Sequence, residues 1–585
     1  MQPKKFDFQL YKKVIQLTRP YRGTLWICAI LAVVIAPISS LRPYLVNVMV
    51  DDHIMKMDAP GLSQMALLLI GLLIVESFLR YFFIYATGFL GQSVIRDLRS
   101  DVFRHITNLR MRYFDKTPIG TSTTRTINDL ETINSVFSEG LITIIADILA
   151  LLAVLVMMFA TSYKLTLICL TTMPILLIAT YFFKESVRKS FQKVRTQIAV
   201  MNAFLQERIS GMRIVQIFNA ERQEAVKFKK INRDYTKANL DSIFAYALFF
   251  PAVEIISAAS LGLMVWWGSG WVLESEVTLG ALIAFPIYIN MLFRPIRMLA
   301  DKFNTLQMGL VASERVFNLL ETPDFISNKG VVKADNIKGA IAFDDVDFAY
   351  DTDYPILKKV SFSINAGETL AIVGPTGSGK STMINLLSRF YERDGGEISV
   401  DQIPIEDYEL HSLRSKIAVV LQDVFLFSGT ILDNISLRNE HISKEQMIQA
   451  AKMIHAHEFI MRLPNNYEFH VSERGSNLSM GQRQLISFVR AMVYDPAILV
   501  LDEATSSIDN ETEAIIQFAI ETLIKKRSSI IIAHRLSTIR HANKILVLEH
   551  GEVVEFGTHD DLMQRTDGHY RELYENQFLK MVESE

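Results

Sequence analysis

The sequence predicts two domains of different kinds, an all-α domain of six transmembrane helices followed by an α/β domain with a parallel sheet. Three observations support this prediction. Six apolar stretches precede residue 300, and each has the roughly 20 residues that a helix needs to cross a hydrocarbon core of about 30 Å. A polar, loop-like stretch covers residues 322–338. After it, short apolar runs rich in β-branched residues alternate with helical patterns, which is typical of parallel strands joined by crossover helices.

The apolar stretches set the limits of the first domain. Basic residues precede the first stretch, but it is too long for a signal peptide and no small-residue cleavage site follows it, so we expect an uncleaved span. We expect a transmembrane domain over residues 1–321, a linker over 322–338 and the α/β domain over 339–585. The predicted spans lie near 23–47, 62–90, 138–160, 163–184, 243–269 and 277–299.

Lysine and arginine are unevenly distributed around these spans. They are frequent from Arg96 to Arg125, between the second and third spans, and from Lys184 to Lys230, between the fourth and fifth. The loops on the opposite side contain only Lys56 and Lys164. Because cytoplasmic loops carry the excess of basic residues, we expect both termini and the α/β domain in the cytoplasm. The chain would then be a multi-pass protein of the inner (cytoplasmic) membrane.

The two basic segments are too long to be loops without structure. Apolar residues recur in them at helical spacing, so we interpret them as transmembrane helices prolonged into the cytoplasm. Each pair of prolonged helices would turn over a short connector, one near Tyr113–Gly120 and one near Gly211, where Pro and Gly break the helical pattern. A solvated amphipathic face without a partner is the alternative interpretation.

Charge and cysteine content exclude several classes of function. The formal net charge is −3, and no charge excess favours a nucleic-acid partner. The two cysteines, Cys28 and Cys169, both lie in apolar stretches and have no metal-ligand spacing. We therefore expect neither a disulfide framework nor a cysteine metal site.

A glycine-rich motif gives the clearest local signal of function. The segment Gly374-Pro-Thr-Gly-Ser-Gly-Lys380-Ser381 follows a predicted strand and precedes a predicted helix. Its backbone N–H groups can curl around phosphate oxygens, and the helix N-terminus adds a favourable dipole. Lys380 would reach the β- and γ-phosphates of ATP, and Ser381 would bind Mg²⁺. The predicted ATP-binding residues of this loop are Gly374, Pro375, Thr376, Gly377, Ser378, Gly379, Lys380, Ser381 and Thr382.

A second motif is the apolar run Ile498–Leu501, which is followed by Asp502 and Glu503. In a parallel sheet this strand would end beside the phosphate loop, so that Asp502 could hold Mg²⁺ through water. Glu503 could polarise the water that attacks the γ-phosphate. The α/β domain is therefore predicted to be a phosphate-loop nucleoside triphosphatase.

With the motif Leu478-Ser-Met-Gly-Gln482, the chain resembles an ATP-binding cassette (ABC) exporter half-transporter, similar to bacterial multidrug or lipid exporters with fused membrane and ATPase domains. This motif resembles the family signature Leu-Ser-Gly-Gly-Gln and lies between the phosphate loop and Asp502, as in the family. Its alternative interpretation is an ordinary helix start capped by Ser479. The resemblance implies that Ser479, Gly481 and Gln482 contact nucleotide.

The resemblance implies further roles. Tyr350 matches the aromatic that stacks on adenine, and Gln422 matches the glutamine that contacts Mg²⁺ and the attacking water. Asp509 resembles the residue of the loop that crosses to the other subunit, and His534 matches the histidine that contacts the γ-phosphate. With Glu503, the implied catalytic residues are Gln422 and His534; the implied metal ligands are Ser381, Gln422 and Asp502. The segments 113–129 and 205–221 resemble the two coupling segments of the family.

In this family two ATPase domains meet head to tail, so the resemblance implies a dimer. Met480 departs from the usual glycine, and its side chain restricts a loop that contacts nucleotide through its backbone. A full catalytic set beside an altered signature resembles one member of a heterodimer, so a heterodimer is favoured, with one fast and one slow ATP site. A homodimer stays open.

The expected function is ATP-driven export of a small amphipathic substrate, a drug, lipid or peptide, by alternating access in the lipid bilayer. Ionisable residues inside spans often line a substrate cavity, although interhelical pairing is the alternative. Two other functions stay open: an ATP-gated channel or regulator, and an importer permease fused to its ATPase. A DNA-associated ATPase is excluded by the six spans. The ionisable candidates are Arg42, Glu76, Arg80, Asp147, Glu254 and Arg294.

Overall fold

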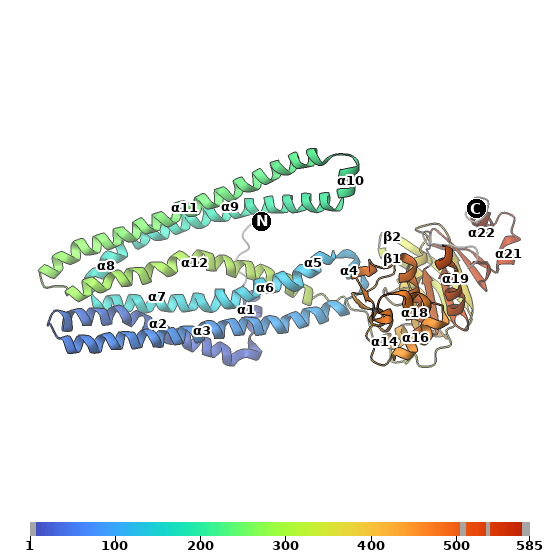
Figure 1. The fold of residues 1–585 in the computed structure, drawn as a ribbon, viewed down its shortest axis with the longest axis horizontal. Coiled ribbons are helices and arrows are strands. Elements are labelled where there is room, and N and C mark those ends of the chain that lie inside the picture. Colours follow the sequence, from blue (N-terminus) through green and yellow to red (C-terminus); the bar gives the residue numbers. More distant parts are fainter. Residues whose placement is uncertain (1–7, 503–509, 534–538, 576–585) are drawn as a thin grey trace. The chain divides into compact units, whose positions relative to one another are not determined.

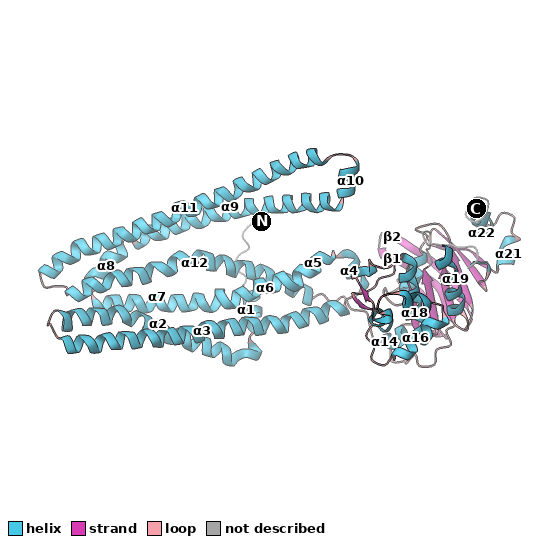
Figure 2. Cartoon of the chain, viewed as in Figure 1, coloured by secondary structure: helices cyan, strands magenta, loops and turns pink. Residues whose placement is uncertain are grey.

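The structure is a computed structural model that describes residues 8–502, 510–533 and 539–575. The chain forms two compact units. The first consists of Met1–Thr107 and Pro118–Thr322, and the second of Pro323–Glu585 together with Asn108–Thr117. Among the described residues, strands occur only in the second unit, as Figure 2 shows.

The first unit is built from long helices (Figure 1). In the described part of the chain, five helical stretches are long and apolar enough to cross a membrane, and Leu279–Pro295 is a shorter apolar helix. Short π-helical turns at Arg125–Asp129 and Val136–Gly140 connect α5, α6 and α7. The helices are α1 (Phe8–Gln16), α2 (Arg22–Val48), α3 (Ala59–Asn108), α5 (Ile119–Thr124), α6 (Leu130–Ser135), α7 (Leu141–Thr161), α8 (Tyr163–Thr171), α9 (Met173–Ser210), α10 (Met212–Ile217), α11 (Glu221–Leu273) and α12 (Leu279–Leu320).

The core of the first unit forms where α12 packs against α7, α8 and α11. Phe285, Tyr288 and Phe293 of α12 are fully buried there. The ring of Phe249 on α11 stacks on that of Phe183 on α9, with 3.8 Å between centroids. Helices α9 and α11 run side by side well beyond the predicted spans and turn at α10 (Figure 1). The chain is therefore helical on both sides of Gly211, as its pattern predicted, and the cytoplasmic position of this segment and its role in coupling stay predictions.

In the described part of the second unit, the strands form a large sheet, a smaller sheet and the two-stranded pair β7-β8. The large sheet has the strand order β12-β11-β3-β10-β9-β6, and β11, β3, β10, β9 and β6 pair in parallel. The smaller sheet, with order β2-β1-β4-β5, is antiparallel. Strands β1 (Ile341–Asp351) and β2 (Tyr354–Ile364) form a tight hairpin, which was not predicted from the sequence.

The remaining strands are β3 (Thr369–Val373), β4 (Gly395–Val400), β5 (Ile403–Pro404), β6 (Ile417–Val420), β7 (Gly429–Thr430), β8 (His470–Val471), β9 (Ile498–Asp502), β10 (Ser528–Ile532), β11 (Lys544–Glu549) and β12 (Glu552–Gly557). The helices are α4 (Met111–Lys116), α13 (Lys380–Leu387), α14 (Leu410–Ser415), α15 (Ile431–Ser436), α16 (Lys444–Met453), α17 (His457–Arg462), α18 (Met480–Val493), α19 (Asn510–Ile524), α21 (His559–Met563) and α22 (His569–Tyr574).

The large sheet is buried on both faces, which explains its continuous apolar strands. Successive side chains of a strand point to opposite faces, so Leu370 and Ile372 enter the core shared with α13 and the small sheet. Ala371 and Val373 enter the other core, which contains residues of α15, α16, α18 and α19. This layering fixes the carboxyl end of β3, where the glycine-rich loop begins.

Candidate nucleotide site

The glycine-rich loop joins β3 to α13 and has a backbone that favours glycine. Gly374, Gly377 and Gly379 all have positive φ angles, of 151°, 85° and 106°. A Cβ atom at Gly374 would lie 2.1 Å from the carbonyl oxygen of Leu548, and one at Gly379 would lie 2.7 Å from Cδ2 of Leu357. A side chain at Gly374 would meet backbone and one at Gly379 would meet the buried Leu357, and the φ angles at both positions favour glycine, so the loop keeps its N–H groups uncovered.

Lys380 is the first residue of α13, and only 9% of it is exposed. Its Nζ donates hydrogen bonds to the carbonyl oxygens of Gly374 (2.8 Å) and Pro375 (2.9 Å). Burial lowers the pKa of Lys380, and the negative charge of Asp502 opposes this shift. The Lys380 side chain therefore folds back onto the loop, and the loop carbonyls surround its ammonium group. This ammonium group is close enough to Asp502 for the two charges to interact.

The loop residues fit a bound phosphate chain. The Ser378 hydroxyl is buried and has no hydrogen-bond partner among the described residues. Gly379, in a left-handed conformation, is the N-cap residue of α13. Because glycine has no side chain to accept their hydrogen bonds, the first N–H groups of the helix remain available to a ligand. Unsatisfied donors, a helix N-terminus and a lysine together match an anionic ligand. Ser381 is exposed at the same turn, which suits a Mg²⁺ ligand bound to that anion.

The sheet register brings the other predicted residues to the same edge. Ile532 of β10 pairs with Ile372 of β3 on one side and with Asp502 of β9 on the other. Val420 of β6 pairs with Leu501, and the exposed Gln422 follows two residues later. The phosphate loop, Asp502 and Gln422 therefore share the carboxyl edge of the parallel strands. Glu503, Asp509 and His534 lie outside the described residues.

The signature motif begins α18. The Ser479 hydroxyl accepts a hydrogen bond from the Gln482 backbone N–H (3.2 Å), and the Gln482 side chain accepts one from the Ser479 N–H (3.0 Å). This capping box satisfies two N–H groups of the first turn. Gly481 is buried and Met480 is partly buried. Ser479 is therefore the N-cap residue of α18, as the alternative interpretation predicted. If Ser479 also contacts nucleotide, the hydroxyl that caps the helix must make that contact.

Tyr350, near the end of β1, is connected to the phosphate-loop helix. Its hydroxyl donates to Thr382 Oγ1 (3.4 Å) and accepts from the amide of Asn385 (3.2 Å). The ring of Tyr391 meets that of Tyr350 edge-on, with 4.9 Å between centroids. Sequence reasoning missed Asn385 and Tyr391, because neither belongs to a motif. The one signal in the sequence is the aromatic pair Phe390-Tyr391 after α13, and it indicates Tyr391 alone.

The ionisable residues of the transmembrane stretches are partly paired. Glu76 and Arg80 form an ion pair of 3.1 Å within α3. Asp147 of α7 pairs with Lys302 of α12, a residue just beyond the predicted sixth span. For these residues the interhelical or local pairing that the sequence left open is what the structure contains. Lys302 is not among the ionisable candidates from the sequence, because it lies after the predicted end of the sixth span.

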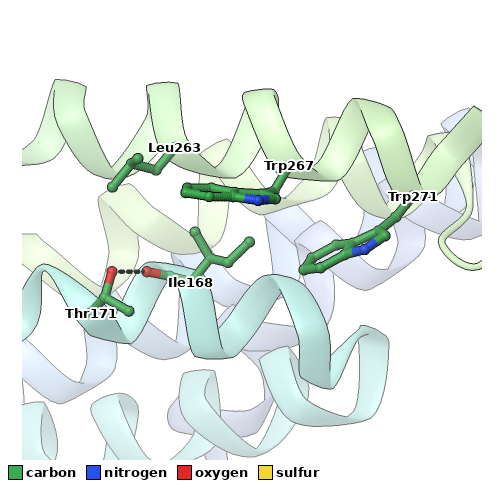
Figure 3. A pocket seen from close by; sticks show the side chains of 5 residues that line it. All are labelled: Ile168, Thr171, Leu263, Trp267 and Trp271. Atoms are coloured by element: carbon green, nitrogen blue, oxygen red, sulfur yellow. Dashed lines mark hydrogen bonds between the residues drawn. The ribbon is translucent and has the colours of Figure 1, made fainter.

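Pockets occur among the described residues of the first unit. An apolar pocket of about 300 Å³ lies between α8 and α11, and Figure 3 shows the Trp267 and Trp271 rings facing Ile168 across it. A more polar pocket of about 400 Å³ lies between α6 and α12, and Asn128, Glu131 and Ser135 contribute to it from one helical stripe. None of the ionisable residues predicted from the sequence lines either pocket. The second pocket is lined instead by Glu131, a carboxylate that the sequence did not single out.

The fold and the site define a class of protein: a helical transmembrane domain fused to a phosphate-loop ATPase domain. Comparison with known families gives the same division. The family model for the ABC transporter transmembrane region matches residues 25–296, and the ABC transporter model for the ATPase domain matches residues 357–506. The chain belongs to the ABC transporters.

Similar proteins extend over the whole chain. An uncharacterized ABC transporter ATP-binding protein, YknV of Bacillus subtilis, is 39% identical over 99% of this chain and 96% of its own length. A putative multidrug export ATP-binding/permease protein, YgaD of the same organism, is 35% identical over 97% and 99%. An ATP-dependent lipid A-core flippase of Syntrophus aciditrophicus is 32% identical over 98% and 96%. The protein is therefore an ATP-hydrolysing, multi-pass membrane transporter of the exporter type.

Proposed function

We propose that this chain is one half of a dimeric exporter, which moves a small amphipathic molecule out of the cytoplasm by alternating access. The observation that carries this proposal is the fusion, in one chain, of long apolar helices with a phosphate-loop domain that contains both the loop and the signature helix. Relatives named as multidrug export and lipid A-core flippase proteins support an amphipathic substrate.

The nucleotide site would form between two chains. Ser479 and the N–H of Gly481, at the start of α18, would bind the γ-phosphate of ATP held by the partner's phosphate loop. In each loop, Lys380 would donate to the β- and γ-phosphates, Ser381 and Gln422 would bind Mg²⁺ directly, and Asp502 would hold it through water. Mg²⁺ neutralises charge that develops on the transferred phosphoryl group. Tyr350 would stack on the adenine.

Hydrolysis would depend on residues that follow β9 and β10. Glu503 would accept a proton from the attacking water, and His534 would contact the γ-phosphate. Asp509 would lie at the contact with the other subunit. Because the closed pair of ATPase domains is stabilised by ATP and destabilised by its products, binding and hydrolysis would alternately favour two arrangements of the membrane domain.

Transmission to the membrane domain would use the two coupling segments. The apolar side chains of Ile214 and Ile217 on α10, and of Phe218 directly after it, are exposed. Exposed apolar side chains that are gathered at one turn mark a surface that contacts another protein part. We propose that this turn docks on an ATPase domain of the dimer. Both coupling segments have an excess of Lys and Arg, which supports a position on the cytoplasmic side of the inner membrane. Both termini and the ATPase domain would then lie on the same side.

Export itself can be tested by reconstitution. The purified complex in liposomes, with ATP supplied on the side of the ATPase domains, is expected to move an amphipathic probe across the membrane. Hoechst 33342 and a fluorescent phosphatidylethanolamine serve as probes, and a transported probe should also change the rate of ATP hydrolysis. Lys380→Ala protein and protein-free liposomes are the controls. ATP hydrolysis without movement of either probe, and unaffected by both, would instead favour an ATP-gated regulator.

We further propose that the partner is a related but different chain, because Met480 replaces the signature glycine while the phosphate loop is complete. Purification of the tagged chain from its native membrane is expected to recover a second, related polypeptide in equal amount. This complex should have one fast and one slow ATP site, which single-turnover measurements would resolve. Recovery of the tagged chain alone, as a dimer, would contradict the heterodimer.

A further inference from the structure

The segment Asn108–Thr117, here called the docking segment, lies between the second and third predicted spans in the sequence. In the structure it belongs to the same compact unit as the ATPase domain. It contains the short helix α4. The backbone N–H of Arg110 donates to the carbonyl oxygen of Asp324 (3.0 Å), and Leu109 forms a β-bridge with Phe325. The docking segment is thus anchored by its backbone at the start of the unit.

Three side chains of the docking segment contact residues of the ATPase domain. Arg110 donates to Glu392 (2.9 Å). Lys116 pairs with Asp351 at 2.9 Å. Asp115 accepts a hydrogen bond from the hydroxyl of Tyr391. These partners share one property: Glu392 directly follows Tyr391, and Asp351 directly follows Tyr350.

Tyr391 joins these contacts to the predicted adenine site. Only 9% of Tyr391 is exposed, and its ring contacts those of Tyr350 and Phe348 edge-on, at centroid distances of 4.9 and 5.7 Å. Phe348 also meets Tyr350 edge-on at 4.9 Å. Three mutually perpendicular rings resist rotation of any one of them, because each fills the space beside the other two.

The hydroxyl of Tyr350 is held from the opposite direction. Thr382 and Asn385, both on α13, bind this hydroxyl. The Tyr350 ring therefore lies between the phosphate-loop helix and Tyr391, whose own hydroxyl is held by Asp115. Burial, followed by the hydrogen bond to Asp115, raises the pKa of Tyr391, so its hydroxyl remains a protonated donor.

We propose that the Asp115–Tyr391 hydrogen bond orients the ring of Tyr350, so that the docking segment positions the nucleotide base and thereby sets the affinity for ATP. This inference rests on the proposed role of Tyr350 in stacking on adenine. Tyr391 and Asp115 are positioning residues, since they act through Tyr350 and touch no reacting atom. By thermodynamic linkage, a base stacked on Tyr350 also strengthens the attachment of the docking segment.

Tyr391→Phe and Asp115→Asn test this proposal in the full-length complex. Tyr391→Phe removes the hydrogen bond, and Asp115→Asn removes the charge that strengthens it. Asp115 is exposed, so its variant leaves the core intact. We expect each variant to raise the KM for ATP about threefold to tenfold, with kcat at saturating ATP unchanged. The double variant should be no worse than Tyr391→Phe alone, because that variant has already lost the bond whose charge Asp115→Asn removes.

A probe without a base separates positioning of adenine from general damage. Inorganic tripolyphosphate can use the phosphate loop but has nothing to stack on Tyr350, so its inhibition constant should be the same in wild type, Tyr391→Phe and Asp115→Asn. Tyr408→Phe is the matched control, because Tyr408 is a buried tyrosine of the same domain whose hydroxyl donates to Val400 (3.1 Å). It should leave the KM for ATP unchanged.

The outcomes separate this inference from the proposed function. Tyr350→Ala must raise the KM for ATP without affecting tripolyphosphate; if it does not, the assignment of Tyr350 to adenine is wrong. If Tyr350→Ala has this effect but neither Tyr391→Phe nor Asp115→Asn does, only the positioning role is overturned. Equal weakening of ATP and tripolyphosphate by Tyr391→Phe and by Asp115→Asn would also overturn it, because a disturbed phosphate loop would then explain both.

Discussion

Lys380→Ala is expected to abolish ATP hydrolysis and to weaken ATP binding. The ammonium group of Lys380 is nearly buried and bridges the carbonyl oxygens of Gly374 and Pro375. Its removal takes away both the loop tether and the charge-assisted hydrogen bonds to phosphate, which together correspond to about tenfold to a hundredfold in ATP affinity. Because these bonds should strengthen in the transition state, hydrolysis is expected to fall by about 10³-fold.

Calorimetric titration with ATP and a phosphate-release assay would measure the two losses. A thermal unfolding scan adds an independent readout, since ATP should raise the unfolding temperature of the wild type and not that of the variant. Lys444→Ala is the matched control, because Lys444 lies in the same domain and pairs with Glu468 at the surface. Unchanged ATP affinity in the Lys380→Ala protein would be incompatible with the assigned role of the loop.

Glu503→Gln is expected to stop hydrolysis while ATP still binds. The residue directly follows Asp502, the last residue of β9, at the edge of the sheet that also carries the phosphate loop. The amide keeps the size of the carboxylate but cannot accept the proton of the attacking water, and a general base contributes about 10²- to 10⁴-fold to a rate. The variant should also retain ATP for longer, which a filter-binding assay with labelled nucleotide would detect.

The control for Glu503→Gln is the same chemical change elsewhere. Glu521→Gln alters an exposed carboxylate on α19 and should leave the rate unaffected. Hydrolysis by the Glu503→Gln protein at the wild-type rate would mean that another group activates the water. Loss of ATP binding together with hydrolysis would instead indicate that Glu503 shapes the site.

The accuracy of the sequence predictions differed between the two domains. The spans and their helical prolongations agree with α2, α3, α7, α9, α11 and α12, because apolar length and helical period are local properties. In the ATPase domain, the strand before Gly374 and the helix after Lys380 were located as β3 and α13. The antiparallel pairing of β1 with β2 was not predicted, although the uneven burial along β1 differs from the continuous burial of β3 in the parallel sheet.

The candidate site was predicted in part. Gly374–Thr382 could be predicted as a phosphate loop because such a loop is contiguous in sequence, and its glycines have backbone conformations that favour glycine. Lys302 beside Asp147 could not be found, because the two residues are 155 positions apart. The capping box of Ser479 and Gln482 had been named only as an alternative, and the structure contains it.

The sequence by itself determined a helical membrane part followed by an α/β ATPase part, the apolar helices of the first and the glycine-rich loop of the second. These features depend on composition, period and short motifs, which act over a few turns of chain. Only the tertiary structure decided that residues 108–117 join the ATPase unit and that Asp115 holds Tyr391, a residue 276 positions away. Such a contact exists only when packing of the whole unit brings the two surfaces together, so no local pattern can encode it.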